Sequence, residues 1–290
     1  MDLAEAAGES PLRLRRMDRS QALGFAAARI ALRGARAAPV PGGDPDWGIF
    51  LGSSLACWAS NALFFLDLLR RPLAELSPAL FARTVPNAVS GEISIAHGIG
   101  GVSQTFVSGW TAGAEALAEA AAFLAEGRAR WLVAGGVEAP DALLRSMYTA
   151  ARSEVAEDWL PAEIAEAAAV LVLTGGRDDS PGTRIRAFCR SHDTQGRFSL
   201  AEALDLLPVL SIGTLIVANT VPPRILDRWR LEMGRAEVVV LPESTGEIGA
   251  AGAPVAAALA ASRVHEGRGG SVVILARGME GNTVLLALGP

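Results

Sequence analysis

The chain has 290 residues, half of them hydrophobic, with 26 basic and 31 acidic side chains and a formal net charge of −5. Every basic residue is an arginine, so chemistry that needs a lysine amine is excluded, and the scattered arginines form no basic stripe of the kind that binds nucleic acid. No apolar run reaches the roughly 18 residues of a membrane span, and the acidic N-terminal segment lacks the apolar core of a signal peptide. We therefore expect a cytoplasmic, reduced protein.

The first half of the chain predicts alternating helices and strands after a loose start. Residues 1–17 are expected to be disordered or loosely attached, and residues 18–36 have the spacing of an amphipathic helix. A short buried strand, "WGIFLGSS", precedes a helix that ends near Pro72, and "SPALFARTVPNAVSGEISIAHG" is typical of a broken helix. A strand, "GGVSQTFVS", then leads into the helix "TAGAEALAEAAAFLAEG", which has a threonine cap and ends at Gly127.

Three further strands are predicted after this helix, and the second half of the chain then repeats the alternation of strands and helices. The three strands are "RWLVAGGVEA", "AAAVLVLTGG" and "TRIRAFCR", and we expect the last of them to continue the same sheet. Further on, "LSIGTLIVANT" predicts a strand, "PPRILDRWRLEMG" a helix, "AEVVVLPEST" a strand, "GEIGAAGAPVAAALAASRVHEG" a buried helix, and "GSVVILARG" and "NTVLLALG" two closing strands. We expect one domain over residues 1–290, built from two similar α/β halves of about 18–180 and 181–290.

The joints between these elements resemble the β-ketoacyl synthase family. "VSGWTAGAEAL" is similar to the strand and buried helix between which that family mounts its cysteine, and Gly135 to Ala139 match its Gly-Gly-x-Glu-Ala segment. Glu166 in "AEAAAVLVL", the run "STGEIGAAGAPVAAAL" and the closing "ARGMEGNTVLLAL" resemble later family motifs. The resemblance implies a thiolase-like layered αβαβα fold with two pseudo-duplicated halves, shortened relative to the family because its opening strand is missing.

The residues that carry the family's chemistry are replaced. Trp110 stands where the family has its cysteine, and an indole cannot form a thioester. Of the two histidines that the resemblance implies, one falls at Glu247 and the other aligns loosely with Asn219, while the family's lysine has no counterpart. Met279 occupies the loop that usually gates the pocket with phenylalanine. Trp110 is expected either to close the acyl pocket or only to fill the core, and both alternatives leave no catalytic residue.

Other chemistry-bearing residues have simpler interpretations. Cys57 is expected to be a small buried hydrophobe, and Cys189 with His192 lacks the second ligand pair of a zinc site. His97 matches no catalytic histidine of the family, and His265 is expected to cap a helix. Solvated loop acids are predicted at Glu157, Asp158, Asp178 and Asp179. No glycine-rich run matches a phosphate-binding loop, so we expect neither a cofactor nor a metal.

Because its catalytic residues are replaced, this chain resembles a chain length factor. That is the non-catalytic subunit that pairs with an active β-ketoacyl synthase in type II polyketide, aryl-polyene or fatty-acid-like pathways. The resemblance implies a heterodimer that acts on substrates delivered by an acyl carrier protein, without independent condensing activity. It places Thr105, Phe106 and Val107 at the interface, and Pro86, Asn87 and Met279 beside the partner's tunnel. The alternatives are a stand-alone acyl-thioester hydrolase or decarboxylase that uses Glu247, and a scaffold that binds acyl groups or the carrier protein.

Overall fold

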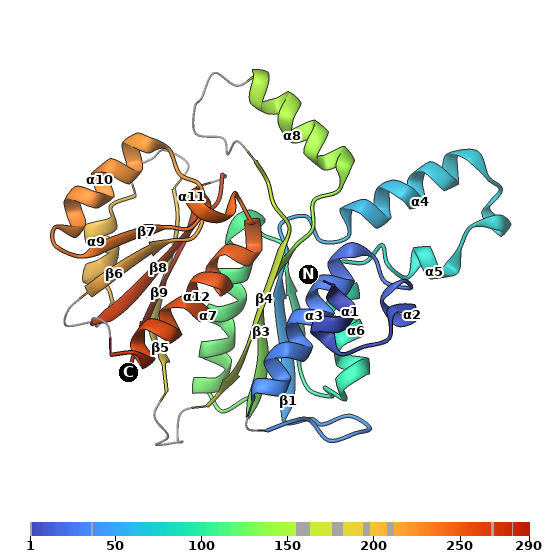
Figure 1. Ribbon diagram of the computed structural model, residues 1–290, viewed down its shortest axis with the longest axis horizontal. Coiled ribbons are helices and arrows are strands. Elements are labelled where there is room, and N and C mark those ends of the chain that lie inside the picture. The colour runs from blue at the N-terminus through green and yellow to red at the C-terminus, as the bar shows by residue number, and fades with distance from the viewer. Residues whose placement is uncertain are drawn as a thin grey trace.

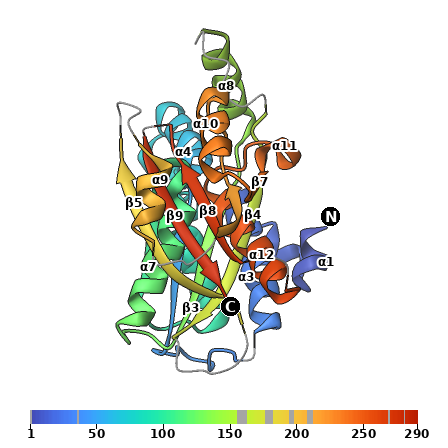
Figure 2. The same ribbon diagram turned by 90° about the vertical axis from the view of Figure 1, so that its left-hand side faces the viewer.

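Two twisted sheets and three layers of helices build the protein (Figures 1 and 2). The computed structural model describes residues 2–35, 37–154, 163–175, 182–193, 198–207, 212–267, 270–279 and 281–290. The acids predicted at 157, 158, 178 and 179 lie outside these ranges. Within the described residues, no helix is long and apolar enough to cross a membrane.

The first sheet has the order β2-β1-β3-β4 in the described part of the chain. Its first three strands are parallel to one another, and β4 runs antiparallel to β3. The strands are β1 (Trp47–Gly52), β2 (Ser103–Phe106), β3 (Trp131–Glu138) and β4 (Ala167–Thr174). The strands β1, β3 and β4 are mostly apolar runs in a sheet that helices cover on both faces, as expected for mainly parallel strands, whereas β2 is short and partly exposed.

The second sheet repeats this arrangement with one more strand, in the order β5-β9-β8-β6-β7 across the described residues. Here β6, β7 and β8 are parallel, β9 is antiparallel to β8, and β5 is antiparallel to β9. The strands are β5 (Arg184–His192), β6 (Ile212–Val217), β7 (Glu237–Val240), β8 (Ser271–Arg277) and β9 (Asn282–Gly289). The prediction that β5 continues the first sheet is wrong: its alternating pattern marks a strand but cannot specify which sheet takes it.

The helices fall into one middle layer and two outer layers. Between the sheets lie α7 (Ala112–Ala125) and α12 (Gly252–His265), which pack on each other and on strands of both sheets. Outside the first sheet lie α3 (Arg19–Gly34) and α6 (Ala88–His97), and outside the second lie α9 (Leu200–Asp205) and α10 (Pro223–Met233). This order of layers confirms the predicted thiolase-like αβαβα fold.

Further helices lie at the margins of these layers. The projecting arm in Figure 1 contains α4 (Trp58–Arg70) and α5 (Pro78–Phe81), joined through the 3₁₀ turn η1 (Leu73–Glu75). In addition, α8 (Ala142–Glu154) follows β3, and α11 (Pro242–Thr245) follows β7. Each middle helix is preceded by a 3₁₀ turn, η2 (Gly109–Thr111) before α7 and η3 (Gly249–Ala251) before α12.

Glycines let the two halves meet closely at η3. The Ala250 carbonyl oxygen lies so near the backbones of Gly113 on α7 and Gly136 on β3 that a Cβ atom at either glycine would overlap it. Gly52 at the end of β1 faces the Ala112 backbone just as closely. Side chains at these positions would separate the middle helices from the first sheet.

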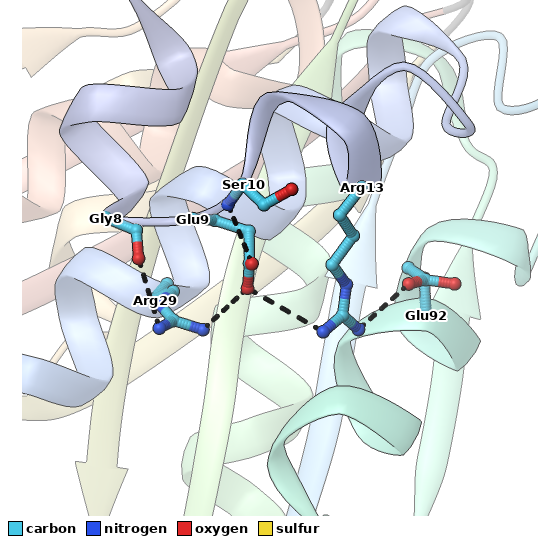
Figure 3. A network of polar contacts seen from close by, with 6 residues as sticks. All are labelled: Gly8, Glu9, Ser10, Arg13, Arg29 and Glu92. Carbon is cyan, nitrogen blue, oxygen red and sulfur yellow. Dashed lines mark hydrogen bonds and ion pairs between the residues drawn. The ribbon is translucent and has the colours of Figure 1, made fainter.

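The N-terminal segment is ordered, contrary to the prediction for residues 1–17. It forms α1 (Leu3–Ala7) and α2 (Pro11–Leu14), and Ala4 and Ala7 are buried, with α1 against α3. Figure 3 shows the contacts that hold it: Glu9 accepts a 3.1 Å hydrogen bond from Arg29, and Arg13 donates one of 3.2 Å to Glu92. These partners lie far away in sequence, so no local pattern reveals them.

Candidate functional site

The candidate site lies where the two middle helices begin, at the carboxyl ends of the parallel strands. Trp110 belongs to η2 before α7, Glu247 precedes η3 and α12, and Asn219 follows β6. Glu138 is the last residue of β3. Open α/β sheets place their ligands at this edge, and the helix N-termini add a positive potential there.

Trp110 is held at the strand-to-helix joint by a tight turn. Gly109 before it has a φ of +63°, in the left-handed region that favours glycine. The Trp110 side chain is buried, at 7% exposure, and lines a cavity of about 210 Å³. Trp110 therefore lies at the joint between β2 and α7 and forms part of the wall of an open cavity. The cavity is also lined by Glu138, Leu144, Tyr148, Glu247 and Met279.

Glu247 is fixed by three hydrogen bonds from its own half. One carboxylate oxygen accepts hydrogen bonds from Asn219 Nδ2 at 3.0 Å and from the Gly249 amide at 2.7 Å. The other accepts one from the Thr220 amide at 2.6 Å. Burial nevertheless raises the pKa of Glu247, because only 1% of the residue is exposed. The structure thus joins two predicted site residues, Glu247 and Asn219, in one rigid pair.

Glu138 is a second buried carboxyl group at the same cavity. One of its oxygens accepts hydrogen bonds from the amides of Ser54 at 3.1 Å and Ala250 at 3.2 Å, and so links β1, β3 and η3. Burial raises the pKa of Glu138, and the nearby charge of Glu247 raises it further. Both carboxyl groups therefore ionise less readily than an exposed glutamate.

Tyr148 on α8 contributes an unused donor. Its hydroxyl is buried and has no hydrogen-bond partner among the described residues, while the ring lines the cavity. Burial, with a smaller effect from Glu247, raises the pKa of Tyr148, so the phenol stays protonated at neutral pH. The cavity therefore combines apolar walls with three groups that can hydrogen-bond a small polar ligand.

The predicted interface and tunnel residues lie on a different surface, except Met279. Thr105 and Phe106 are half-buried at the end of β2, where Thr105 bonds to Ser90 at 3.1 Å and Phe106 packs on Phe50. Val107 is half exposed. Pro86 and Asn87, before α6, are exposed.

Met279 reaches the cavity lining although its side chain is 47% exposed. Among the predicted site residues, the structure thus unites Trp110, Asn219, Glu247 and Met279. The other predicted site residues, namely Thr105, Phe106, Val107, Pro86 and Asn87, lie on the side of β2.

The cysteines and histidines lie outside the cavity lining. Cys57 is buried, its thiol donates to the Thr84 carbonyl at 2.9 Å, and burial raises its pKa, so it is no displaced nucleophile. His192 lies 2.6 Å from Asn282 at the second sheet. His97 stacks on Phe25, and His265 is the exposed last residue of α12. No described cluster of three or more histidine, cysteine or acidic residues could hold a metal ion.

Sequence reasoning did not single out Glu138, Tyr148 and Ser54 as site residues. A signal existed for Glu138, since a charged residue ends an otherwise apolar strand, "WLVAGGVE". No signal in the sequence marks Tyr148 as a site residue, because its place at the cavity depends on how α8 packs over the site.

The comparisons with known proteins agree with this architecture. Residues 4–154, more than half of the chain, match the beta-ketoacyl synthase N-terminal domain. A type II PKS acyl-carrier protein in complex with its ketosynthase bound to the hexaketide (AntDE:AntF, apo) is similar over 98% of this chain and 87% of that one, with a TM-score of 0.83 and 20% identity.

Two further solved structures are similar along their length. The ishigamide ketosynthase/chain length factor matches 99% of this chain and 84% of that one, with a TM-score of 0.75 and 17% identity. A beta-ketoacyl synthase from Burkholderia phymatum STM815 matches 96% and 84%, with a TM-score of 0.78 and 15% identity. No curated protein matches the sequence significantly. The likeness of the structures concerns the fold, and the family match identifies the chain as a member of the beta-ketoacyl synthase family.

Proposed function

We propose that this protein is a non-catalytic ketosynthase-like subunit, of the chain length factor kind, that pairs with an active β-ketoacyl synthase and shapes its acyl tunnel. The observation that carries the proposal is the buried Trp110 in η2 before α7, where the sequence resemblance places the family's nucleophile. Condensation needs an acyl group transferred to a thiolate, and the cavity lining offers no thiol.

The replaced histidine positions support the same conclusion. A developing enolate needs neutral or positive hydrogen-bond donors aimed at its oxygen. Here the carboxyl of Glu247 accepts hydrogen bonds from Asn219 and two amides, so these donors are already engaged. Restoring a thiol alone would therefore leave the oxyanion without donors.

A surface for the partner lies on the side of β2 and the projecting arm. In the described part of the chain, β2 pairs with β1 on one side only. Large apolar side chains stand out on the arm, among them Leu63 at 58% exposure, Phe65 at 60% and Leu69 at 82%. An exposed apolar patch of this kind marks a protein interface. Two solved structures of similar fold are named as a ketosynthase/chain length factor and as a ketosynthase complex with its carrier protein, which favours a synthase partner that is served by a carrier protein.

Co-purification with an intact β-ketoacyl synthase from the same gene neighbourhood tests the pairing. We expect a one-to-one complex by native mass spectrometry, and condensing activity that needs both chains. Leu69→Asp should weaken the complex at least about 30-fold, as for a central apolar contact. Leu231→Asp is the matched control, because Leu231 on α10 is also 82% exposed but lies outside the second sheet. Loss of binding in both variants, or in neither, would contradict this interface.

The cavity favours one alternative, a stand-alone hydrolase or decarboxylase of acyl thioesters. Glu138 and Glu247 are carboxyl groups with raised pKa values beside an open space of about 210 Å³, as general acid–base catalysis requires. Turnover of acyl thioesters by the purified chain alone, abolished by Glu247→Gln, would establish this activity. Acyl or carrier-protein binding without turnover and without a synthase would indicate a scaffold.

A further inference from the structure

Two buried carboxyl groups lie side by side at the cavity next to Trp110. Glu247 accepts a hydrogen bond from the Gly249 amide, and Glu138 accepts one from the next amide along the chain, that of Ala250. Successive amides of η3 therefore hold the two acids as neighbours. Because both residues are more than nine-tenths buried, water and salt screen their mutual repulsion only weakly.

The cavity contains no basic side chain that balances these acids, as far as the described part of its lining goes. Two arginines of α8 lie near it. The guanidinium of Arg145 is engaged by the carbonyl oxygens of Pro140 and Ile164, and Arg152 is exposed. The two carboxyl groups therefore face an enclosed space without a counter-charge on its wall.

The hydrogen bonds at both carboxyl groups nevertheless suit their ionised forms. Glu247 accepts three and Glu138 accepts two, and within the described residues neither group donates one. The amides before α12, which could otherwise bind an anionic ligand, are thus engaged by the protein's own acids. Burial opposes this ionisation and raises the pKa of both groups. A cation in the cavity would remove the conflict.

Two polar atoms at the cavity have no hydrogen-bond partner among the described residues. Only one carboxyl oxygen of Glu138, Oε2, accepts hydrogen bonds, and Oε1 accepts none although the residue is 7% exposed. The hydroxyl oxygen of Tyr148 is buried and equally unpaired. Because buried polar atoms are normally paired, these two mark the place of a ligand that donates hydrogen bonds.

The walls of the cavity add apolar and aromatic surface. The rings of Trp110 and Tyr148 line it, together with Leu144 and Met279. Aromatic faces attract organic cations, most strongly where water is excluded. An apolar cavity of roughly 150 Å³ takes up benzene, so the volume of about 210 Å³ is sufficient for one ring and an amino group.

We propose that this cavity is a binding site for a small primary amine in its ammonium form, with the ammonium group at Glu138 and Glu247. The apolar body of the ligand lies against the rings of Trp110 and Tyr148. An ammonium group has three hydrogen-bond donors and no acceptor. It can therefore donate to Glu138 Oε1 and to the Tyr148 oxygen while it supplies the missing positive charge.

Isothermal titration calorimetry on the purified full chain tests this site without any synthase. The probes are benzylamine and phenethylamine, and the controls are benzyl alcohol and phenethyl alcohol, which have the same shapes without the charge. At about pH 7.5 we expect at least one amine to bind with a Kd below about 1 mM, and at least about tenfold more tightly than its alcohol.

Glu138→Gln should lower the affinity for the amine at least about tenfold and leave that for the alcohol within about twofold. The glutamine keeps an oxygen for the Ser54 and Ala250 amides, so this variant should fold, which its urea midpoint checks. Glu126→Gln is the matched control, because the Glu126 side chain is 61% exposed and lies outside the cavity lining; it should leave both affinities unchanged.

The wild-type affinity for the amine should rise between about pH 5 and about pH 8, because an ammonium ion favours the ionised carboxyl groups and releases their protons. Four results would overturn the proposal: no binding of either amine, alcohols that bind as tightly as the amines, equal amine affinity in wild type and Glu138→Gln, or an affinity that falls as pH rises. None of them depends on pairing with a synthase, so the two proposals can fail separately.

Discussion

Glu138→Gln should change the pH dependence of stability in a defined direction. Glu138 is only 7% exposed, and burial raises its pKa above the value of 4.5 that an unperturbed glutamate has. The substituted glutamine would keep an oxygen for the Ser54 and Ala250 amides, and its amide group imitates the protonated carboxyl. The variant therefore resembles the neutral form of the site at every pH.

The sign and size follow from proton linkage. Between pH 4.5 and its raised pKa, folded Glu138 holds a proton that the unfolded chain has lost, so the free energy of unfolding falls as pH rises. One such group changes it by up to about 1.4 kcal/mol per pH unit, and the loss ends once the pH exceeds the folded pKa. His97 acts in the opposite direction below about pH 6.5, because burial lowers its pKa. The difference between wild type and variant cancels this contribution.

Urea denaturation of both proteins from about pH 5 to about pH 9, in steps of half a unit, measures that difference. We expect the variant to gain stability relative to wild type as pH rises, and then to reach a plateau whose onset marks the pKa of folded Glu138. A difference that stays constant with pH would refute the reasoning, since the carboxyl would then already be ionised in the fold over this range. A difference that shrinks as pH rises would refute it as well.

Three further substitutions test the site and the packing around it. Trp110→Ala should lower the free energy of unfolding by about 3 to 5 kcal/mol, nearer the lower value because one side of the indole already faces the cavity. Urea midpoints measure this change, and a loss below about 1 kcal/mol would mean that the ring is not packed. Trp110→Cys should gain no condensing activity, because Glu247 keeps its three donors engaged; acyl transfer followed by mass spectrometry checks this, and multiple turnovers would contradict it. Gly113→Ala should lower the free energy of unfolding by about 1 to 3 kcal/mol, since its Cβ would overlap the Ala250 carbonyl. The control Gly91→Ala meets open space on α6 and should be neutral or stabilising. Equal effects of the two substitutions in thermal melts would refute the close approach.

Much of the fold could be predicted because its patterns are local. The strand Trp47–Gly52 and the helix Ala112–Ala125 have continuous apolar or alanine-rich runs with clear ends. Trp110 and Glu247 could be assigned to one site only because the motifs around them resemble those that carry the catalytic residues of the β-ketoacyl synthase family. The strand and the helix, in contrast, need only the local period of the sequence.

The rest of the fold and of the site depends on contacts between residues that are distant in the sequence, which no local pattern predicts. The helices α1 and α2 exist through pairs such as Glu9 with Arg29, so their short sequences alone indicate disorder. The alternation in β5 marks an edge strand, but it is equally compatible with either sheet. Glu138 and Tyr148 become neighbours of Trp110 only after β3, α8 and η3 have packed together.

The Ala250 carbonyl, wedged between Gly113 and Gly136, has a consequence for cooperativity. The chain is built as a duplication, yet this atom belongs to one half and both of its glycine neighbours to the other. Glu138 strengthens the same junction by accepting a hydrogen bond from the Ala250 amide. Opening either half would expose the alanine-rich helices of both, so we expect a calorimeter to record one unfolding transition, without a stable half-molecule at intermediate temperature.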